Sequence, residues 1–166
     1  AEPGARGRLA PGLPVLGLLA MGAVGGGFAL AGQWMRPFAT NGDVVRWLRA
    51  NGLADAPLTG FPDMRVEPVA VLLGRGFHAL ECRCATTYVR FDSRRNGFEQ
   101  AMVPERLDEA LRAMPPGPAV FLAGDPLTEA EEEAIRARGI ALVRRVRFDG
   151  AERDIEQTVY TAERTR

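Results

Sequence analysis

Hydrophobic and polar positions predict a regular alternation of strands and helices over most of the chain. Helical spacing of apolar residues occurs in the segments 40–51, 63–75, 103–114 and 128–138. Strand-like runs occur at 57–61, 77–80, 86–91, 119–124, 140–148 and 155–162. Because strands and helices alternate, we expect an α/β domain over residues 40–166, with three layers and a mainly parallel sheet. The last two strands are joined by DGAERD, which favours an antiparallel C-terminal edge.

Local signals support several of these elements. The run AVFLAG at 119–124 is uninterrupted and apolar, as expected for a strand that is covered on both faces. Thr128 and Glu131 have the spacing of a capping box, and Gly139 closes the helix that they begin. We also expect the Thr40 side chain to cap the first helix of the domain.

An apolar segment precedes this domain. No ionisable side chain lies between Arg8 and Arg36, and residues 13–36 are long enough to cross a bilayer as one helix. We therefore expect an N-terminal flank at 1–12 and a transmembrane helix at 13–36. Two alternatives are a signal peptide, with a cleavage-like Ala-Leu-Ala at 29–31, and a glycine-rich arm.

Composition excludes some classes of protein. The chain has 166 residues, of which 46% are hydrophobic and 25% are charged, which is ordinary for a folded domain. Its formal net charge of zero argues against a nucleic-acid partner, because phosphate binding needs a basic excess. All basic residues are arginine, which is typical of GC-rich, bacterial coding sequence and makes arginine pairs weak evidence for a site.

The single histidine and both cysteines lie close together, at His78, Cys82 and Cys84. Zinc sites commonly use C-x₂₋₄-C pairs with a second cluster, so C-x-C predicts no metal site. On a regular strand the two sulfurs share one face, and we expect a disulfide between them to be strained. The cysteines are therefore interpreted as ordinary half-buried strand residues, and no catalytic or metal-binding residue is assigned.

A polar surface is the stronger candidate for binding. If residues 86–91 form a strand, Tyr88, Arg90 and Asp92 share one face, and Arg94 follows at its end. Arginine binds anionic oxygens through paired hydrogen bonds, and a tyrosine ring stacks on a sugar, so this face suits a saccharide or phosphate. The alternative is an exposed strand with an internal Arg–Asp pair.

Asp63 is a further candidate, because it follows a predicted strand at the position where α/β proteins usually bind ligands. Its ordinary structural interpretation is an acid at the start of a helix. His78 completes the set of candidate binding residues.

The succession from WMRPFATNGDVVRWLRANGLADAPLTGFPDMRVEPVAVLLGR to YVRFDSRR resembles the C-terminal part of polytopic membrane glycosyltransferases. The resemblance covers residues 15–95 and is to mannosyl- and arabinosyltransferase-like enzymes that use polyprenyl-phosphate sugars. It implies that a last transmembrane helix is followed by a small extracytoplasmic α/β domain. The acidic catalytic loops of such enzymes, and any divalent metal that they use, belong to regions near the N-terminal helices, so no catalytic residue is carried over.

The resemblance predicts an accessory domain of a membrane glycosyltransferase, inactive alone and without a cofactor of its own. Its partners would be the lipid bilayer and a lipid-linked sugar or glycan, and its location the outer side of the cell membrane. A membrane-anchored extracytoplasmic binding module that is complete without other segments is the first alternative. A small exported enzyme with a site around Asp63, His78 and Arg90 is the second.

Overall fold

The computed structural model describes residues 19, 21–26, 40–89, 97–150 and 156–165. The chain divides into two compact units, residues Ala1–Pro37 and Phe38–Arg166, and the second contains the α/β domain. The helices of this domain are α2 (Asn41–Ala50), α3 (Asp63–Leu73), the 3₁₀ helix η2 (Gln100–Met102), α4 (Val103–Ala113) and α5 (Glu129–Arg136). Its strands are β1 (Leu58–Phe61), β2 (Phe77–Ala79), β3 (Cys84–Thr86), β4 (Ala119–Ala123), β5 (Ile140–Phe148) and β6 (Gln157–Arg164).

Among the described residues, the strands form one sheet in the order β3-β2-β1-β4-β6-β5. Strand β1 is parallel to β2 and β4, whereas β6 is antiparallel to both β4 and β5. Four of the six strands therefore run in one direction, and β3 and β6 run in the other. This confirms the mainly parallel sheet and its antiparallel C-terminal hairpin. We call the end at which β1, β2 and β4 begin the amino edge, and the opposite end the carboxyl edge.

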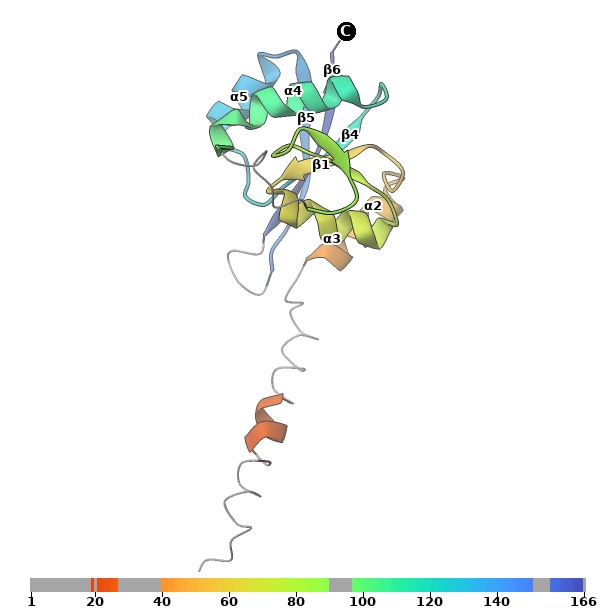
Figure 1. The fold of residues 1–166 in the computed structure, drawn as a ribbon, viewed down its shortest axis with the longest axis vertical. Coiled ribbons are helices and arrows are strands. Elements are labelled where there is room, and N and C mark those ends of the chain that lie inside the picture. The colour runs from red at the N-terminus through yellow and green to blue at the C-terminus, as the bar shows by residue number, and fades with distance from the viewer. Residues whose placement is uncertain (1–18, 20, 27–39, 90–96, 151–155, 166) are drawn as a thin grey trace, which may run out of the picture. The chain divides into compact units, whose positions relative to one another are not determined.

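Helices cover both faces of the sheet, which confirms the three-layer arrangement (Figure 1). Buried side chains of α2 and α3 form one core with Leu58, Val120 and Leu122. Buried side chains of α4 and α5 form a second core with Phe121 and Tyr160. All five residues of β4 are buried, as expected for a strand between two helical layers.

The capping predictions had opposite outcomes. The Thr128 hydroxyl accepts a hydrogen bond from the Glu131 backbone, and the Glu131 carboxylate accepts one from the Thr128 backbone, so the capping box is confirmed. The predicted cap at Thr40 is wrong, because Thr40 has helical backbone angles and its side chain makes no capping hydrogen bond. A capping side chain reaches the first turn when its own backbone is extended, and Thr40 is not.

The strand predicted at 86–91 is also placed differently. Strand β3 occupies Cys84–Thr86, and Thr87 and Tyr88 form a bend beyond it. The Thr86 hydroxyl donates to the Tyr88 carbonyl at 2.7 Å, and this local hydrogen bond turns the chain away from the ladder.

The prediction for residues 13–36 falls mostly outside the described residues. Residues 21–26 are helical, and the side chains of Leu19, Met21 and Val24 are exposed. Within the described part of the chain, no helix combines the length and apolar character that a membrane crossing requires.

Candidate functional site

Asp63 lies at the carboxyl edge, directly after β1 and at the first residue of α3, as the sequence predicts. Its side chain is buried, and its Oδ1 accepts a hydrogen bond from the Leu80 backbone N–H at 3.1 Å. In return the Glu81 carboxylate accepts a hydrogen bond from the Asp63 backbone N–H at 3.0 Å. Hydrogen bonds to the two acids thus connect the β2–β3 turn with the start of α3. This geometry favours the interpretation of Asp63 as a structural acid at the start of a helix.

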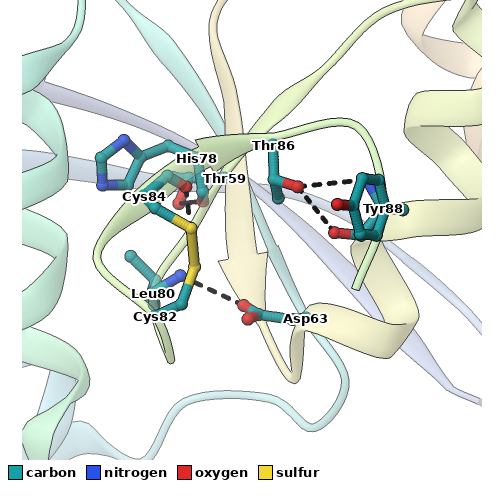
Figure 2. Close-up of a disulfide and its surroundings, with 8 residues drawn as sticks. All are labelled: Thr59, Asp63, His78, Leu80, Cys82, Cys84, Thr86 and Tyr88. Carbon is teal, nitrogen blue, oxygen red and sulfur yellow. Dashed lines mark hydrogen bonds between the residues drawn. A yellow bond between two sulfur atoms is a disulfide. The ribbon is translucent and has the colours of Figure 1, made fainter. Parts of the chain in front are cut away.

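Cys82 and Cys84 form a disulfide in this turn, which corrects the interpretation as free strand residues (Figure 2). Only Cys84 belongs to β3, because residues 80–83 form the turn of the hairpin. The φ angle of Arg83 is 55°, and the resulting sharp turn brings the two Cα atoms to 5.3 Å. That separation is ordinary for a disulfide, so the strain expected for a regular strand does not apply.

His78 lies on β2, and strand alternation directs its side chain away from the face on which Phe77 and Ala79 are buried. It lines an open groove of about 440 Å³ at the amino edge. The walls of this groove, which we call the His78 groove, include His78, Gly76, Thr87, Met114 and Pro115. Gly76 is required there, because a Cβ atom would lie 2.8 Å from the Thr86 carbonyl oxygen.

The electrostatics of His78 favour an uncharged ring. Its partial burial lowers the pKa of the imidazole below the ordinary value, and the negative charge of Glu109 opposes this shift only in part. A neutral imidazole offers one hydrogen-bond donor and one acceptor. Together with the exposed Thr87 and the apolar surfaces of Met114 and Pro115, it forms a surface suited to hydroxyl-rich, uncharged groups.

The structure divides the predicted binding residues between the two edges. The Asp63 carboxylate accepts its hydrogen bond from Leu80, in the turn after β2, whereas the His78 side chain lines the groove at the amino edge. Figure 2 shows the His78 ring and the Asp63 carboxylate on different sides of the hairpin. This arrangement does not support an active site that contains both residues.

Tyr88 remains a candidate near the His78 groove. It follows the groove residue Thr87 directly, and its side chain is 53% exposed. The other predicted residues of this surface, Arg90, Asp92 and Arg94, lie outside the described residues.

A second cleft of about 350 Å³, which we call the arginine cleft, adjoins the His78 groove and is not predicted from the sequence. It is lined by Arg112 at the end of α4 and Arg164 at the end of β6, and it shares Met114 and Pro115 with the His78 groove. Asp108 lies between the two arginines. The i,i+4 spacing of Asp108 and Arg112 is visible in the sequence, but the approach of Arg164 depends on the tertiary fold.

Within the residues that the structure describes, no three His, Cys, Asp or Glu side chains are grouped as a metal site would require. Comparison with known protein families, with curated protein sequences and with solved structures found no match to this chain. Three features of the chain therefore bear on its function: the two adjoining clefts, the disulfide and the sequence itself.

Proposed function

We propose that residues 40–166 form an extracytoplasmic, saccharide-binding accessory domain of a membrane glycosyltransferase that uses a lipid-linked sugar donor. The observation that carries the proposal is the His78 groove, whose volume of about 440 Å³ is within the range of small-molecule sites. Its neutral imidazole and threonine hydroxyl suit sugar hydroxyl groups, and its apolar walls suit the C–H face of a sugar ring. The resemblance over residues 15–95 supports the choice of enzyme class.

The disulfide supports an extracytoplasmic location for the domain. Cys82 and Cys84 are bonded to each other, and disulfides persist mainly in oxidising compartments outside the cytoplasm. A domain of this kind is therefore suited to the extracytoplasmic side of a cell membrane.

The apolar segment supports attachment to the membrane. Residues 13–36 have the length of a membrane-spanning helix, and the described residues 21–26 are helical. The exposed side chains of Leu19, Met21 and Val24 would contact lipid favourably. In this proposal the bilayer is a partner of the chain, whereas catalysis and any divalent metal belong to other parts of the enzyme.

The side of the membrane is tested by fusing alkaline phosphatase, which matures only in an oxidising compartment, to the C terminus of the full chain. We expect an active fusion in a bacterial host. An inactive fusion together with a fluorescent cytoplasmic reporter at the same position would contradict the proposal.

The sugar role is tested by ligand-observed NMR on the full chain in phosphatidylcholine nanodiscs, with glucose, mannose and arabinose oligosaccharides as probes. We expect magnetisation transfer to at least one sugar, and loss of that signal in His78→Gln and Thr87→Val. Glu129→Gln, an exposed change on α5, is the control that retains binding. If none of the sugars binds, the saccharide role is contradicted.

The same groove also favours a second candidate, a membrane-anchored binding module without an associated enzyme. The two candidates are separated by reading the gene upstream of Ala1. Several further apolar spans with an acidic loop support the glycosyltransferase, and a start codon immediately before Ala1 supports the independent module.

A further inference from the structure

The cleft beside the His78 groove contains two arginines that are held in place by one carboxylate. Arg112 Nη2 lies 2.7 Å from Asp108 Oδ2, and Arg112 Nε lies 3.1 Å from the same oxygen. Arg164 Nε lies 3.1 Å from Asp108 Oδ1. The Asp108 side chain is 10% exposed, whereas those of Arg112 and Arg164 are 60% and 45% exposed. The carboxylate is therefore nearly buried behind two accessible guanidinium groups.

The charge balance at this cleft favours an anion. The hydrogen bond from Arg112, followed by the charges of Arg112, Arg164 and Arg138, holds the pKa of Asp108 below its ordinary value despite its burial. Asp108 is ionised at neutral pH and neutralises one of these three cations. Of the other nearby acids, Glu109 forms ion pairs with Arg83 and Arg106. Glu163 lines the cleft, but it precedes Arg164 on β6, so strand alternation turns its side chain toward the opposite face.

The remaining donors have the geometry that anions use. A guanidinium carries five N–H donors. Arg112 contacts Asp108 through Nε and Nη2, whereas Arg164 forms its ion pair with Asp108 through Nε alone. The other N–H groups of Arg112 and Arg164 have no hydrogen-bond or ion-pair partner among the described residues. Since the carboxylate already orients both side chains, less conformational entropy is lost when they bind a phosphate or carboxylate together.

The adjoining groove indicates what the anionic group is attached to. Met114 and Pro115 line both the arginine cleft and the His78 groove, so one ligand can extend across them. We propose that Arg112 and Arg164 form an anion subsite that binds the phosphate or carboxylate of a sugar whose ring occupies the His78 groove. The sugar part of this inference rests on the proposed function, whereas the anion part stands on the arginine cleft alone.

The choice between a glycan and a lipid as the source of the anion follows from the groove beside the cleft. The His78 groove, which is proposed to hold the sugar ring, shares Met114 and Pro115 with the arginine cleft. We therefore assign the anion to a glycan in the aqueous phase, because a phosphatidylglycerol headgroup carries no sugar ring for the His78 groove.

The test is a calorimetric titration of the full chain in phosphatidylcholine nanodiscs with glucose, glucose 1-phosphate, glucuronate and inorganic phosphate. We expect both charged sugars to bind about tenfold more tightly than glucose, as one additional charge-assisted contact implies. Arg112→Gln and Arg164→Gln should each remove most of this preference. Arg136→Gln is the matched control, because Arg136 forms a similar i,i+4 ion pair with Glu132 and its side chain is 54% exposed. Circular dichroism checks that each variant is folded.

The outcomes separate this inference from the proposed function. Binding of glucose and the charged sugars with equal affinity, or an equal effect of Arg136→Gln, would overturn the anion subsite and leave the saccharide role intact. Arginine-dependent binding of phosphate without any sugar binding would support the subsite and contradict the saccharide role. Vesicles with and without phosphatidylglycerol distinguish the source, and arginine-dependent binding to the anionic vesicles alone would overturn the assignment to a soluble glycan.

Discussion

The Glu81 carboxylate accepts a hydrogen bond from the Asp63 backbone N–H at 3.0 Å, while Asp63 Oδ1 accepts one from the Leu80 backbone N–H. These two bonds connect the β2–β3 turn with the first turn of α3, although the residues are 17 and 18 positions apart in the chain. Each carboxylate satisfies a buried backbone donor that would otherwise be unpaired. The hairpin that carries His78 is therefore fixed to the core at its turn.

Replacing Asp63 with alanine leaves the Leu80 N–H without its acceptor. We expect Asp63→Ala to lower the free energy of unfolding by about 2 kcal/mol, because a buried donor is left unsatisfied. Asp63→Asn retains an oxygen acceptor and should lower it less. Urea denaturation followed by circular dichroism measures both, with the exposed Glu129→Ala as control. Equal losses in the alanine and asparagine variants would show that Oδ1 is not the important acceptor.

The disulfide should stabilise the turn and contribute little to the whole fold. It closes a loop with a sequence separation of only two, so it removes little conformational entropy from the unfolded chain. We expect reduction to lower the free energy of unfolding by about 1–2 kcal/mol, and to change amide chemical shifts mainly within residues 77–88. The Cys82→Ser/Cys84→Ser variant should not respond to reductant. Global unfolding on reduction would contradict this local role.

Much of the fold follows from local sequence patterns. The apolar run of β4 and the Thr128–Glu131 capping box depend on neighbouring residues, and both are confirmed. The Cys82–Cys84 bond was not predicted, because a regular strand was assumed where Arg83 makes a turn with positive φ. No short-range spacing signals that turn.

The candidate site was less accessible to sequence reasoning. Asp63 was placed correctly at the end of a strand, but its partners come from a hairpin later in the chain. The arginine cleft requires the end of α4 and the end of β6 to meet, with Arg112 and Arg164 52 positions apart (164 − 112). In a chain whose basic residues are all arginine, such a pair is visible only in the folded structure.

Asp108 should make stability depend on pH in the acid range. Because the hydrogen bond from Arg112 lowers its pKa in the folded state, its stabilising contribution is complete above the ordinary aspartate value and disappears as pH falls through the lowered one. We expect Asp108→Asn to cost about 1–2 kcal/mol at pH 7, since hydrogen bonds to a charged group are lost. The difference from the unsubstituted chain should shrink below about pH 4. Urea titrations at pH 7, 4 and 3 measure it.

The arginine that causes this shift provides a second variant. Arg112→Gln removes the largest contribution to the lowered pKa of Asp108. The free energy of unfolding of this variant should therefore also depend less on pH in the acid range. If the free energies of unfolding of Asp108→Asn and the unsubstituted chain differ by the same amount from pH 7 to pH 3, the ionised, buried carboxylate on which the arginine cleft depends would be contradicted.

His78 should produce a separate dependence nearer to neutral pH. Desolvation lowers the pKa of its imidazole in the folded state, although Glu109 opposes the shift, so the unfolded chain binds the proton more tightly. Stability is therefore fully present above the ordinary histidine value of about 6.5 and decreases as pH falls below it toward the lowered value. Denaturation midpoints at pH 7.5, 6.5 and 5.5 should fall for the unsubstituted chain and fall less for His78→Gln. Parallel profiles would show that the ring is freely solvated, and the uncharged surface proposed for the sugar would then lose its basis.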